Sequence, residues 1–229
     1  MSDSTKEPVI SSVILWGGTG QAKVCKPILE DQGIKVVAVF DDTPNLRSPF
    51  SDVKIYWGWD AFEEWIGNQS SLEGIGFCVT IGNPHGRIRM KFQEQLMAAG
   101  LAPVTVIHPS AIIAPGVVFG KGVQIMAGAV IQTEVRMGDQ CIINTGAIVD
   151  HENILGDGVE IGPGATLCGN IHVKTNGWVA AGAVVLPGLT IGEDSLVGAG
   201  ALVTRNIPDG VVAYGSPARV VRKVETRNK

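Results

Sequence analysis

The residues from Ile107 to Pro208 read IHPSAI IAPGVV FGKGVQ IMAGAV IQTEVR MGDQCI INTGAI VDHENI LGDGVE IGPGAT LCGNIH VKTNGW VAAGAV VLPGLT IGEDSL VGAGAL VTRNIP when they are divided into sixes. All seventeen first positions are apolar, and the fifth positions are mostly alanine or valine. Chance placement of apolar residues would lose this register within a few repeats. The period of six therefore decides the fold of this half of the chain.

A sustained period of six predicts a parallel β-helix. Each hexad supplies one short strand, three hexads make a triangular coil of eighteen residues, and coils stack about 4.8 Å apart. The first-position side chains fill the interior, and the small fifth positions fit where the chain turns a corner. One hexad cannot bury its own apolar face, so stability comes from stacked neighbours. We expect this domain to span residues 106–208, with residues 209–229 as a C-terminal tail.

Residues 1–105 have a different pattern, which predicts a Rossmann-like α/β domain. An apolar strand at 11–16 is followed by a glycine-rich turn at 17–20, a helix at 21–32 and a second strand at 35–40. Backbone N–H groups at a helix N-terminus can hold a diphosphate, which makes Gly18, Thr19 and Gly20 candidate substrate contacts. Asp41 and Asp42, at the end of the second strand, are candidates for contact with the base or ribose. The alternative is a tight turn that binds no ligand.

The rest of this domain contains one further strand and two further helices. We expect a loop at 43–59, a short helix at 60–66, a buried strand at 76–82 and a helix at 88–100. Ligands bind at the carboxyl ends of parallel strands in such sheets. Asn83 and Arg87, which follow the third strand, are therefore candidate substrate contacts.

Composition excludes several classes of function. The formal net charge is −4, and no basic run occurs before the short C-terminal tail, which argues against a nucleic-acid partner. No apolar run has the length of a membrane span, and the first eight residues are polar, unlike a signal peptide. The four cysteines (Cys25, Cys78, Cys141 and Cys168) have no CxxC spacing. We expect them to be small buried residues of a reduced, cytoplasmic protein.

Several segments together resemble the NeuD/PglD family of bacterial sugar acetyltransferases, over about residues 11 to 222. The matching segments are GGTGQAK, FDD, IGNPHGR, VIHPSA, IINTGAIVDHENILGD and DGVVAYGSPARVV. The resemblance implies that the β-helix is left-handed. It also implies a nucleotide-linked amino sugar held by the N-terminal domain, and acetyl-CoA bound between the subunits of a homotrimer. No metal is implied.

Two positions depart from the family pattern. Gly20-Gln21-Ala22 stands where the family often has Gly-His-Gly. Glu160 stands where the hexad after the catalytic one often has a second histidine. In the family that histidine contacts the acyl donor or the sugar, so Glu160 is a candidate donor contact in this chain.

The VDHE hexad carries the predicted chemistry. Acyl transfer from a thioester to an amine needs a base, and imidazole titrates near neutral pH. His151 occupies a third position, which should point outward. Asp150 and Glu152 are both adjacent, and the sequence does not decide which of them contacts the ring. Asn144, one hexad earlier, could orient the pair, so we expect His151, Glu152 and Asn144 to be catalytic.

The donor site follows from the length of one coil. Gly169 lies eighteen residues after His151, and its backbone N–H is a candidate donor to the thioester oxyanion. Small residues on later coils would leave room for the pantetheine arm: Ala181, Gly182, Ala199 and Gly200. His108 and His172 lack such a context, and we interpret both as structural.

Two acetyl-transfer functions fit the sequence. The first is acetyl-CoA-dependent N-acetylation of a nucleotide-linked amino-deoxy sugar, and the alternative is O-acetylation of a sialic-acid-type sugar. A metal hydratase of the γ-carbonic-anhydrase type needs three clustered histidines, and Gly156 stands where a partner of His151 would be required. A non-enzymatic scaffold would bind no acetyl-CoA. Outward apolar residues such as Met126, Ile148 and Trp178 further predict a trimer.

Overall fold

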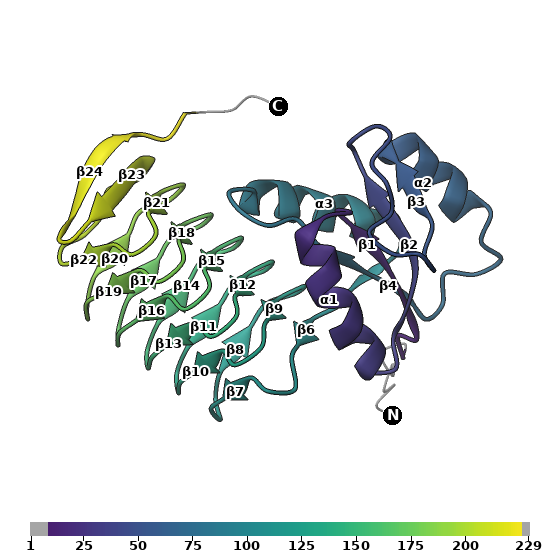
Figure 1. Cartoon of the computed structure of the whole chain (residues 1–229). Coiled ribbons are helices and arrows are strands. Elements are labelled where there is room, and N and C mark those ends of the chain that lie inside the picture. Colours follow the sequence, from purple (N-terminus) through teal and green to yellow (C-terminus); the bar gives the residue numbers. More distant parts are fainter. Residues whose placement is uncertain (1–8, 226–229) are drawn as a thin grey trace. The chain divides into compact units, whose positions relative to one another are not determined.

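The computed structural model describes residues 9–225, and they divide into two compact units (Figure 1). The first unit contains the residues up to Ile81 together with Phe92–Val104. The second contains Gly82–Lys91 and the residues from Thr105 onwards. The sequence places the domain boundary near residue 105. The contacts in addition assign the ten-residue segment Gly82–Lys91 to the second unit.

The first unit is built on a five-stranded parallel sheet in the order β3-β2-β1-β4-β5. The elements are β1 (Ser12–Trp16), α1 (Gly20–Asp31), β2 (Lys35–Asp41), β3 (Ile55–Trp57), α2 (Gly58–Gly67), β4 (Ile75–Val79) and β5 (Ala102–Pro103). Helix α3 (Gly86–Ala98) begins in the second unit and ends in the first. Strand β3 lies within the segment that the sequence predicts to be loop.

Aromatic side chains form the centre of this unit. The rings of Trp16 and Phe40 stack with their centroids 5.6 Å apart, and Phe62 packs edge-on against both. These residues come from β1, β2 and α2, so the cluster fixes helix α2 on the sheet. Their burial places the carboxyl ends of β1 and β2 side by side, as a nucleotide-binding edge requires.

The second unit is the predicted parallel β-helix. Its seventeen short strands are β6 (Val106–Ile107), β7 (Ile112–Ile113), β8 (Val118–Phe119), β9 (Gln124–Ile125), β10 (Val130–Ile131), β11 (Arg136–Met137), β12 (Ile142–Ile143), β13 (Ile148–Val149), β14 (Ile154–Leu155), β15 (Glu160–Ile161), β16 (Thr166–Leu167), β17 (His172–Val173), β18 (Trp178–Val179), β19 (Val184–Val185), β20 (Thr190–Ile191), β21 (Leu196–Val197) and β22 (Leu202–Val203). Each strand from β6 to β19 pairs with the strand eighteen residues later, for example Ile148 with Thr166.

The strands form three faces of a prism, which Figure 1 shows as stacked short arrows. Face I contains β6, β9, β12, β15, β18 and β21; face II contains β7, β10, β13, β16, β19 and β22; face III contains β8, β11, β14, β17 and β20. The first-position residues from Ile125 to Val203 are buried in the interior, together with the alanines and valines of the fifth position. This core confirms the register derived from the sequence.

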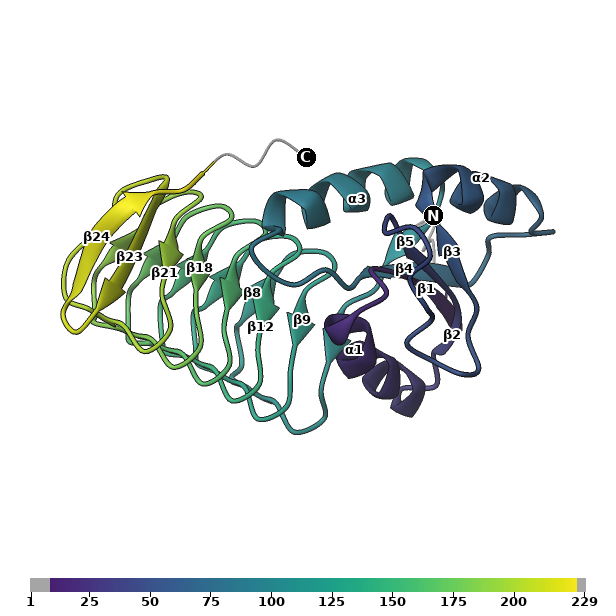
Figure 2. The same ribbon diagram turned by 45° about the horizontal axis from the view of Figure 1, so that its top comes forward.

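An antiparallel hairpin ends the stack of face I, where the sequence predicts only a tail. Strands β23 (Val211–Gly215) and β24 (Ala218–Lys223) extend that sheet beyond β21 (Figure 2). Val211, Ala213 and Ala218 join the core of the prism and cover its last coil. None of the three helices within residues 9–225 is long and apolar enough to span a membrane.

Candidate active site

His151 and Glu152 form a side-chain pair at the turn between β13 and β14, on the edge where faces II and III meet. Nδ1 of His151 lies 2.9 Å from Oε2 of Glu152. The Asp150 carboxylate instead accepts the backbone N–H of His151, at 2.8 Å. The structure thus selects Glu152, and not Asp150, as the partner of the ring.

This pairing determines which ring nitrogen is available. When Nδ1–H donates to the Glu152 carboxylate, Nε2 keeps its lone pair and can accept a proton. About half of each side chain is exposed, at 51% for His151 and 55% for Glu152, so a substrate can reach Nε2. Glu152 has a φ of +61°, a left-handed conformation that directs its carboxylate back to the ring.

Asn153 holds this turn in place from inside the coil. Its side-chain amide donates to the carbonyl oxygens of Asp150 (2.6 Å) and Cys168 (2.9 Å), and its oxygen accepts the N–H of Ile171. The residue is fully buried. Sequence reasoning missed it, although an asparagine at a fifth position, where most hexads have alanine or valine, was a usable signal.

Gly169 lies directly under the imidazole ring. A methyl group added at its Cα would overlap the ring of His151. The backbone N–H of Gly169 donates to no group among the described residues, whereas its carbonyl accepts from Gly188. The predicted oxyanion donor and the predicted base are therefore neighbours, as acyl transfer requires.

The remaining candidates of the β-helix lie on another edge of the prism, where faces I and II meet. Asn144 follows β12, Ala181 and Gly182 follow β18, and Ala199 and Gly200 follow β21. All but Asn144 are exposed. The hexad that crosses face II lies between Asn144 and the edge that carries His151, and its extended chain is roughly 15–20 Å long. Within one chain, face II separates this row from the His151 edge.

Asn144 contacts Glu160 and not His151. Its amide lies 3.4 Å from the Glu160 carboxylate, which sits on the outer surface of β15 but is only 6% exposed. Arg89, from the first turn of α3, covers this carboxylate. Its guanidinium is fully buried and lies 3.7 Å from the carboxylate. Arg89 also donates to the carbonyls of Gln140 and Gly158. No sequence pattern pointed to this residue.

Burial dominates the electrostatics of this pair. It raises the pKa of the Glu160 carboxyl, which the charge of Arg89 and the Asn144 amide offset in part. It likewise lowers the pKa of the Arg89 guanidinium, despite the neighbouring carboxylate. Glu160 is therefore a covered, ion-paired group in the described chain.

Asn83 and Arg87 lie in the segment that joins β4 to α3. Asn83 is half-buried, and its side-chain nitrogen is buried with no hydrogen-bond partner among residues 9–225. The Arg87 guanidinium binds Asp194 at 2.7 Å and Glu193 at 2.5 Å. Asp194 raises the pKa of Arg87, and Arg87 in turn lowers the pKa of Asp194. Of these two candidates, Asn83 has the unused hydrogen-bonding group.

The glycine-rich turn of the first unit is arranged as predicted, with one addition. The N–H of Gly18 donates to the Asp41 carboxylate at 2.7 Å, and the same carboxylate accepts the N–H of Thr43. Gly18 is buried, whereas Thr19 and Gly20 are exposed at the start of α1. Asp42 is also exposed. A phosphate at this turn would therefore meet Thr19 and Gly20 first.

The cysteines have no catalytic setting. Cys25, Cys78 and Cys141 are buried, and Cys168 is half-buried. Burial raises the pKa of the Cys141 thiol to about 12, which keeps it protonated near neutral pH. The prediction that these residues are buried is confirmed for three of the four.

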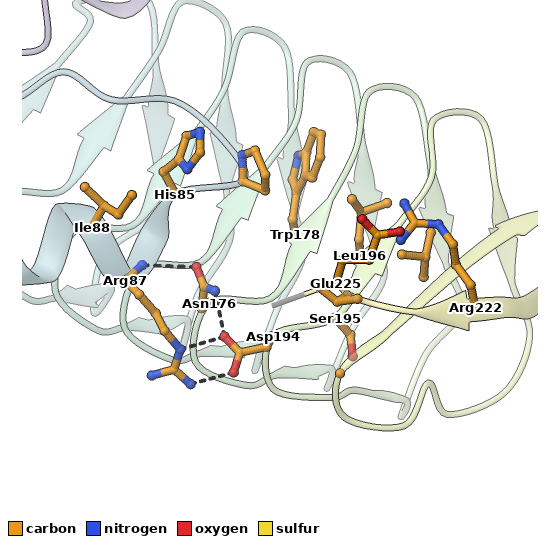
Figure 3. Close-up of a pocket in the computed structure, with 14 residues that line it drawn as sticks. His85, Arg87, Ile88, Asn176, Trp178, Asp194, Ser195, Leu196, Arg222 and Glu225 are labelled. Atoms are coloured by element: carbon orange, nitrogen blue, oxygen red, sulfur yellow. Dashed lines mark hydrogen bonds and ion pairs between the residues drawn. The ribbon is translucent and has the colours of Figure 1, made fainter. Parts of the chain in front are cut away.

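A groove of about 610 Å³ lies on the outer surface of face I (Figure 3). Trp178, Leu196 and Val212 form its floor on three successive coils. His85 and Arg87 belong to one wall, and Arg222 and Glu225 to the opposite side. The segment that carries Arg87 thus borders this groove.

Fold and site together define the class: a hexapeptide-repeat acyltransferase on a left-handed β-helix, with a Rossmann-like domain before it. Structures of such enzymes are similar to the chain. One is the GDP-perosamine N-acetyltransferase of Caulobacter crescentus, which was solved with CoA and GDP-perosamine as a variant with one histidine replaced by alanine. It is 35% identical to this chain, and the match covers 94% of this chain and 99% of that one, with a TM-score of 0.83.

Two further structures agree. The acetyltransferase domain of PglB from Neisseria gonorrhoeae, solved with acetyl coenzyme A, is 27% identical over 93% of this chain and all (100%) of that one, with a TM-score of 0.81. WeeI from Acinetobacter baumannii is 23% identical over 91% of this chain and 99% of its own, with a TM-score of 0.80, and shows the fold alone. No family model matches the chain.

The chain belongs to the hexapeptide-repeat family of nucleotide-amino-sugar N-acetyltransferases. It is an acyltransferase that uses acetyl-CoA and acetylates the amino group of a sugar. This finding confirms the family expected from the sequence and favours N-acetylation over the O-acetylation alternative.

Proposed function

We propose that the enzyme transfers the acetyl group of acetyl-CoA to the amino group of a nucleotide-linked 4-amino-4,6-dideoxy sugar, with His151 as the general base. The observation that carries the proposal is the His151–Glu152 pair stacked over Gly169. The similarity to an enzyme that acts on GDP-perosamine, a sugar of this type, supports the acceptor class.

The reaction follows from the positions of these groups. The acceptor amine attacks the thioester carbonyl, and Nε2 of His151 takes the proton that the nitrogen loses. Glu152 stabilises the imidazolium that forms, because its carboxylate already accepts Nδ1–H. The Gly169 N–H stabilises the tetrahedral oxyanion. Collapse of this intermediate breaks the carbon–sulfur bond, and the departing thiolate of CoA receives the proton from His151.

The separation of the two edges supports a trimer. The row Asn144, Ala181, Gly182, Ala199 and Gly200 lies on one side of face II, and His151 with Gly169 lies on the other side. The outward residues of face II are mostly apolar, with Ile112 63% and Ile148 40% exposed. Three copies with face II toward a common axis would bring the His151 edge of one copy against the Asn144 row of the next.

This arrangement places the acetyl-CoA site between subunits of a homotrimer of three times 24.1 kDa. The pantetheine arm would run along the exposed small residues of the neighbouring copy. Of the apolar residues named from the sequence, Ile148 and the half-buried Trp178 remain available for contacts, whereas Met126 is fully buried within its own chain. Because its substrates are intracellular metabolites, we place the enzyme in the cytoplasm.

The test is an assay of acetyl-CoA with a panel of nucleotide-linked amino sugars that includes GDP-perosamine, with mass spectrometry of the products. We expect a gain of one acetyl group on nitrogen for one member of the panel. His151→Ala should lower kcat by roughly a hundredfold to ten-thousandfold, because a general base contributes about that factor.

Acetyl-CoA binding supplies the matched control. Calorimetry should give His151→Ala the same affinity as the wild-type enzyme, because the predicted donor contacts lie mainly in the other row. An ester product in place of an amide would overturn the proposed acceptor group. Near-normal turnover by His151→Ala would remove His151 from the mechanism.

A further inference from the structure

The segment Gly82–Arg89 follows β4 of the Rossmann-like sheet but is packed on the β-helix. Its closest approach is at Gly86, which faces Gly158 in the coil below. A methyl group on Gly86 would overlap the carbonyl oxygen of Gly158 and the side chain of Asn176. Gly158 has the reciprocal restriction, since a methyl group on it would lie 3.0 Å from the backbone of Gly86. Two backbones meet here with no space for a side chain.

Arg87 adds a second attachment (Figure 3). Its Nε and Nη2 atoms bind both carboxylate oxygens of Asp194, each at 2.7 Å, and its backbone N–H donates to Asn176 at 3.2 Å. Asn176 in turn donates to Asp194 at 2.7 Å. A two-point contact of this kind fixes orientation as well as distance.

Arg89 provides the third attachment, two residues (about half a turn) further along α3. Its fully buried guanidinium bonds to the carbonyls of Gln140 and Gly158 and faces the Glu160 carboxylate. The backbone of Asn83 also lowers the pKa of the Glu160 carboxyl, a smaller effect than burial. The two ends of the segment therefore converge on Glu160.

Asn83 is the residue whose position these attachments determine. Buried polar groups nearly always find a partner, yet the side-chain nitrogen of Asn83 has none among residues 9–225. This nitrogen is thus a buried donor that no residue of the described chain satisfies. A substrate oxygen would complete it.

We infer that Asn83–Arg89 is an acceptor-positioning segment: Gly86, Arg87 and Arg89 fix Asn83 to the catalytic β-helix so that it binds an oxygen of the acceptor sugar. The inference rests on the proposed function, since it requires a nucleotide-linked amino sugar as acceptor. It assigns the recognition of the sugar to a segment that is rigid with the catalytic unit. Arg87 and Arg89 are accordingly positioning residues and do not touch the substrate.

The experiment compares two alanine substitutions four residues apart. Gly86→Ala introduces the overlap with Gly158, whereas Gly82→Ala places its methyl group where no atom lies within 4 Å. We expect Gly86→Ala to raise KM for GDP-perosamine at least about tenfold, the loss of one good hydrogen bond, and to leave KM for acetyl-CoA within about twofold. Gly82→Ala should match the wild-type enzyme in both constants.

Arg87 gives a second test that does not depend on a buried site, because half of its side chain is exposed. Arg87→Ala should raise KM for GDP-perosamine selectively, and Arg87→Lys should restore part of the effect. Equal increases in both KM values, or a lowered Tm with a wild-type acceptor KM, would overturn the inference. Failure of the wild-type enzyme to acetylate any nucleotide-linked amino sugar would instead overturn the proposed function.

Discussion

At the scale of single residues, the site depends on a histidine and on the absence of a side chain beneath it. The VDHE segment predicts His151 as the base because it supplies an imidazole with carboxylates next to it. The partner of the ring, Asp150 or Glu152, could not be predicted, because it depends on the left-handed conformation of Glu152 and on the turn that Asn153 holds together. From the sequence alone either neighbouring carboxylate could contact the ring, and only the backbone conformation decides between them.

Gly169 gives the prediction at this scale. In Gly169→Ala, the added methyl group overlaps the ring of His151, so the imidazole must leave its place above the oxyanion donor. We expect kcat to fall by roughly a hundredfold or more, comparable to the loss of a general base or an oxyanion donor. Steady-state kinetics and calorimetry with acetyl-CoA measure the effect. Unchanged kcat would show that the ring has no catalytic position over Gly169.

At the scale of elements, the period of six predicted nearly all of the β-helix. The register is set by apolar first positions every six residues, a signal that repeats along the whole domain. Strand β3 and the β23–β24 hairpin were missed because each occurs once, with no repeat to reveal it. The attachment of α3 was missed for a related reason. An arginine in a helix is usually expected on the surface. Arg89 is instead buried, where it contacts Glu160 and two backbone carbonyls.

The Arg89–Glu160 pair gives the prediction at this scale. Arg89→Met would leave the Glu160 carboxylate buried without its countercharge, which costs about 3–5 kcal/mol of unfolding free energy near neutral pH. Burial already raises the pKa of Glu160, and loss of Arg89 raises it further. A carboxyl whose folded pKa exceeds its unfolded pKa favours folding at low pH and loses that contribution as the pH rises through the folded value.

The destabilisation by Arg89→Met should therefore be smaller at pH 5 than at pH 8. Urea unfolding of both proteins at the two pH values measures it. The double variant Arg89→Met/Glu160→Met is the control, and it should recover most of the loss because neither charge remains buried. A destabilisation that is independent of pH would mean that lost packing, and not the unpaired carboxylate, is its cause.

At the scale of the whole molecule, the proposed mechanism requires more than one chain. The predicted catalytic and donor residues divide into two rows on different edges of the prism, so one chain would hold only half of each proposed site. Sequence spacing suggested that Asn144 and His151 would act together, and a single chain places them at successive corners. In the proposed trimer a neighbouring copy would bring them into one site, and the exposed apolar face II is the surface on which it would pack.

The most direct measurement is activity after subunit mixing. His151→Ala disables the base edge, and Ala181→Trp blocks the exposed pantetheine row, so each homotrimer should be inactive. In every mixed cyclic trimer, one of the three interfaces pairs an intact His151 edge with an intact Ala181 row. Unfolding and refolding the two variants together at equal amounts should therefore restore about a quarter of wild-type activity. Refolding each variant separately and then assaying the unexchanged mixture should restore none. If the co-refolded mixture is also inactive although mixed trimers are present, each chain carries its own complete site, and the account is contradicted.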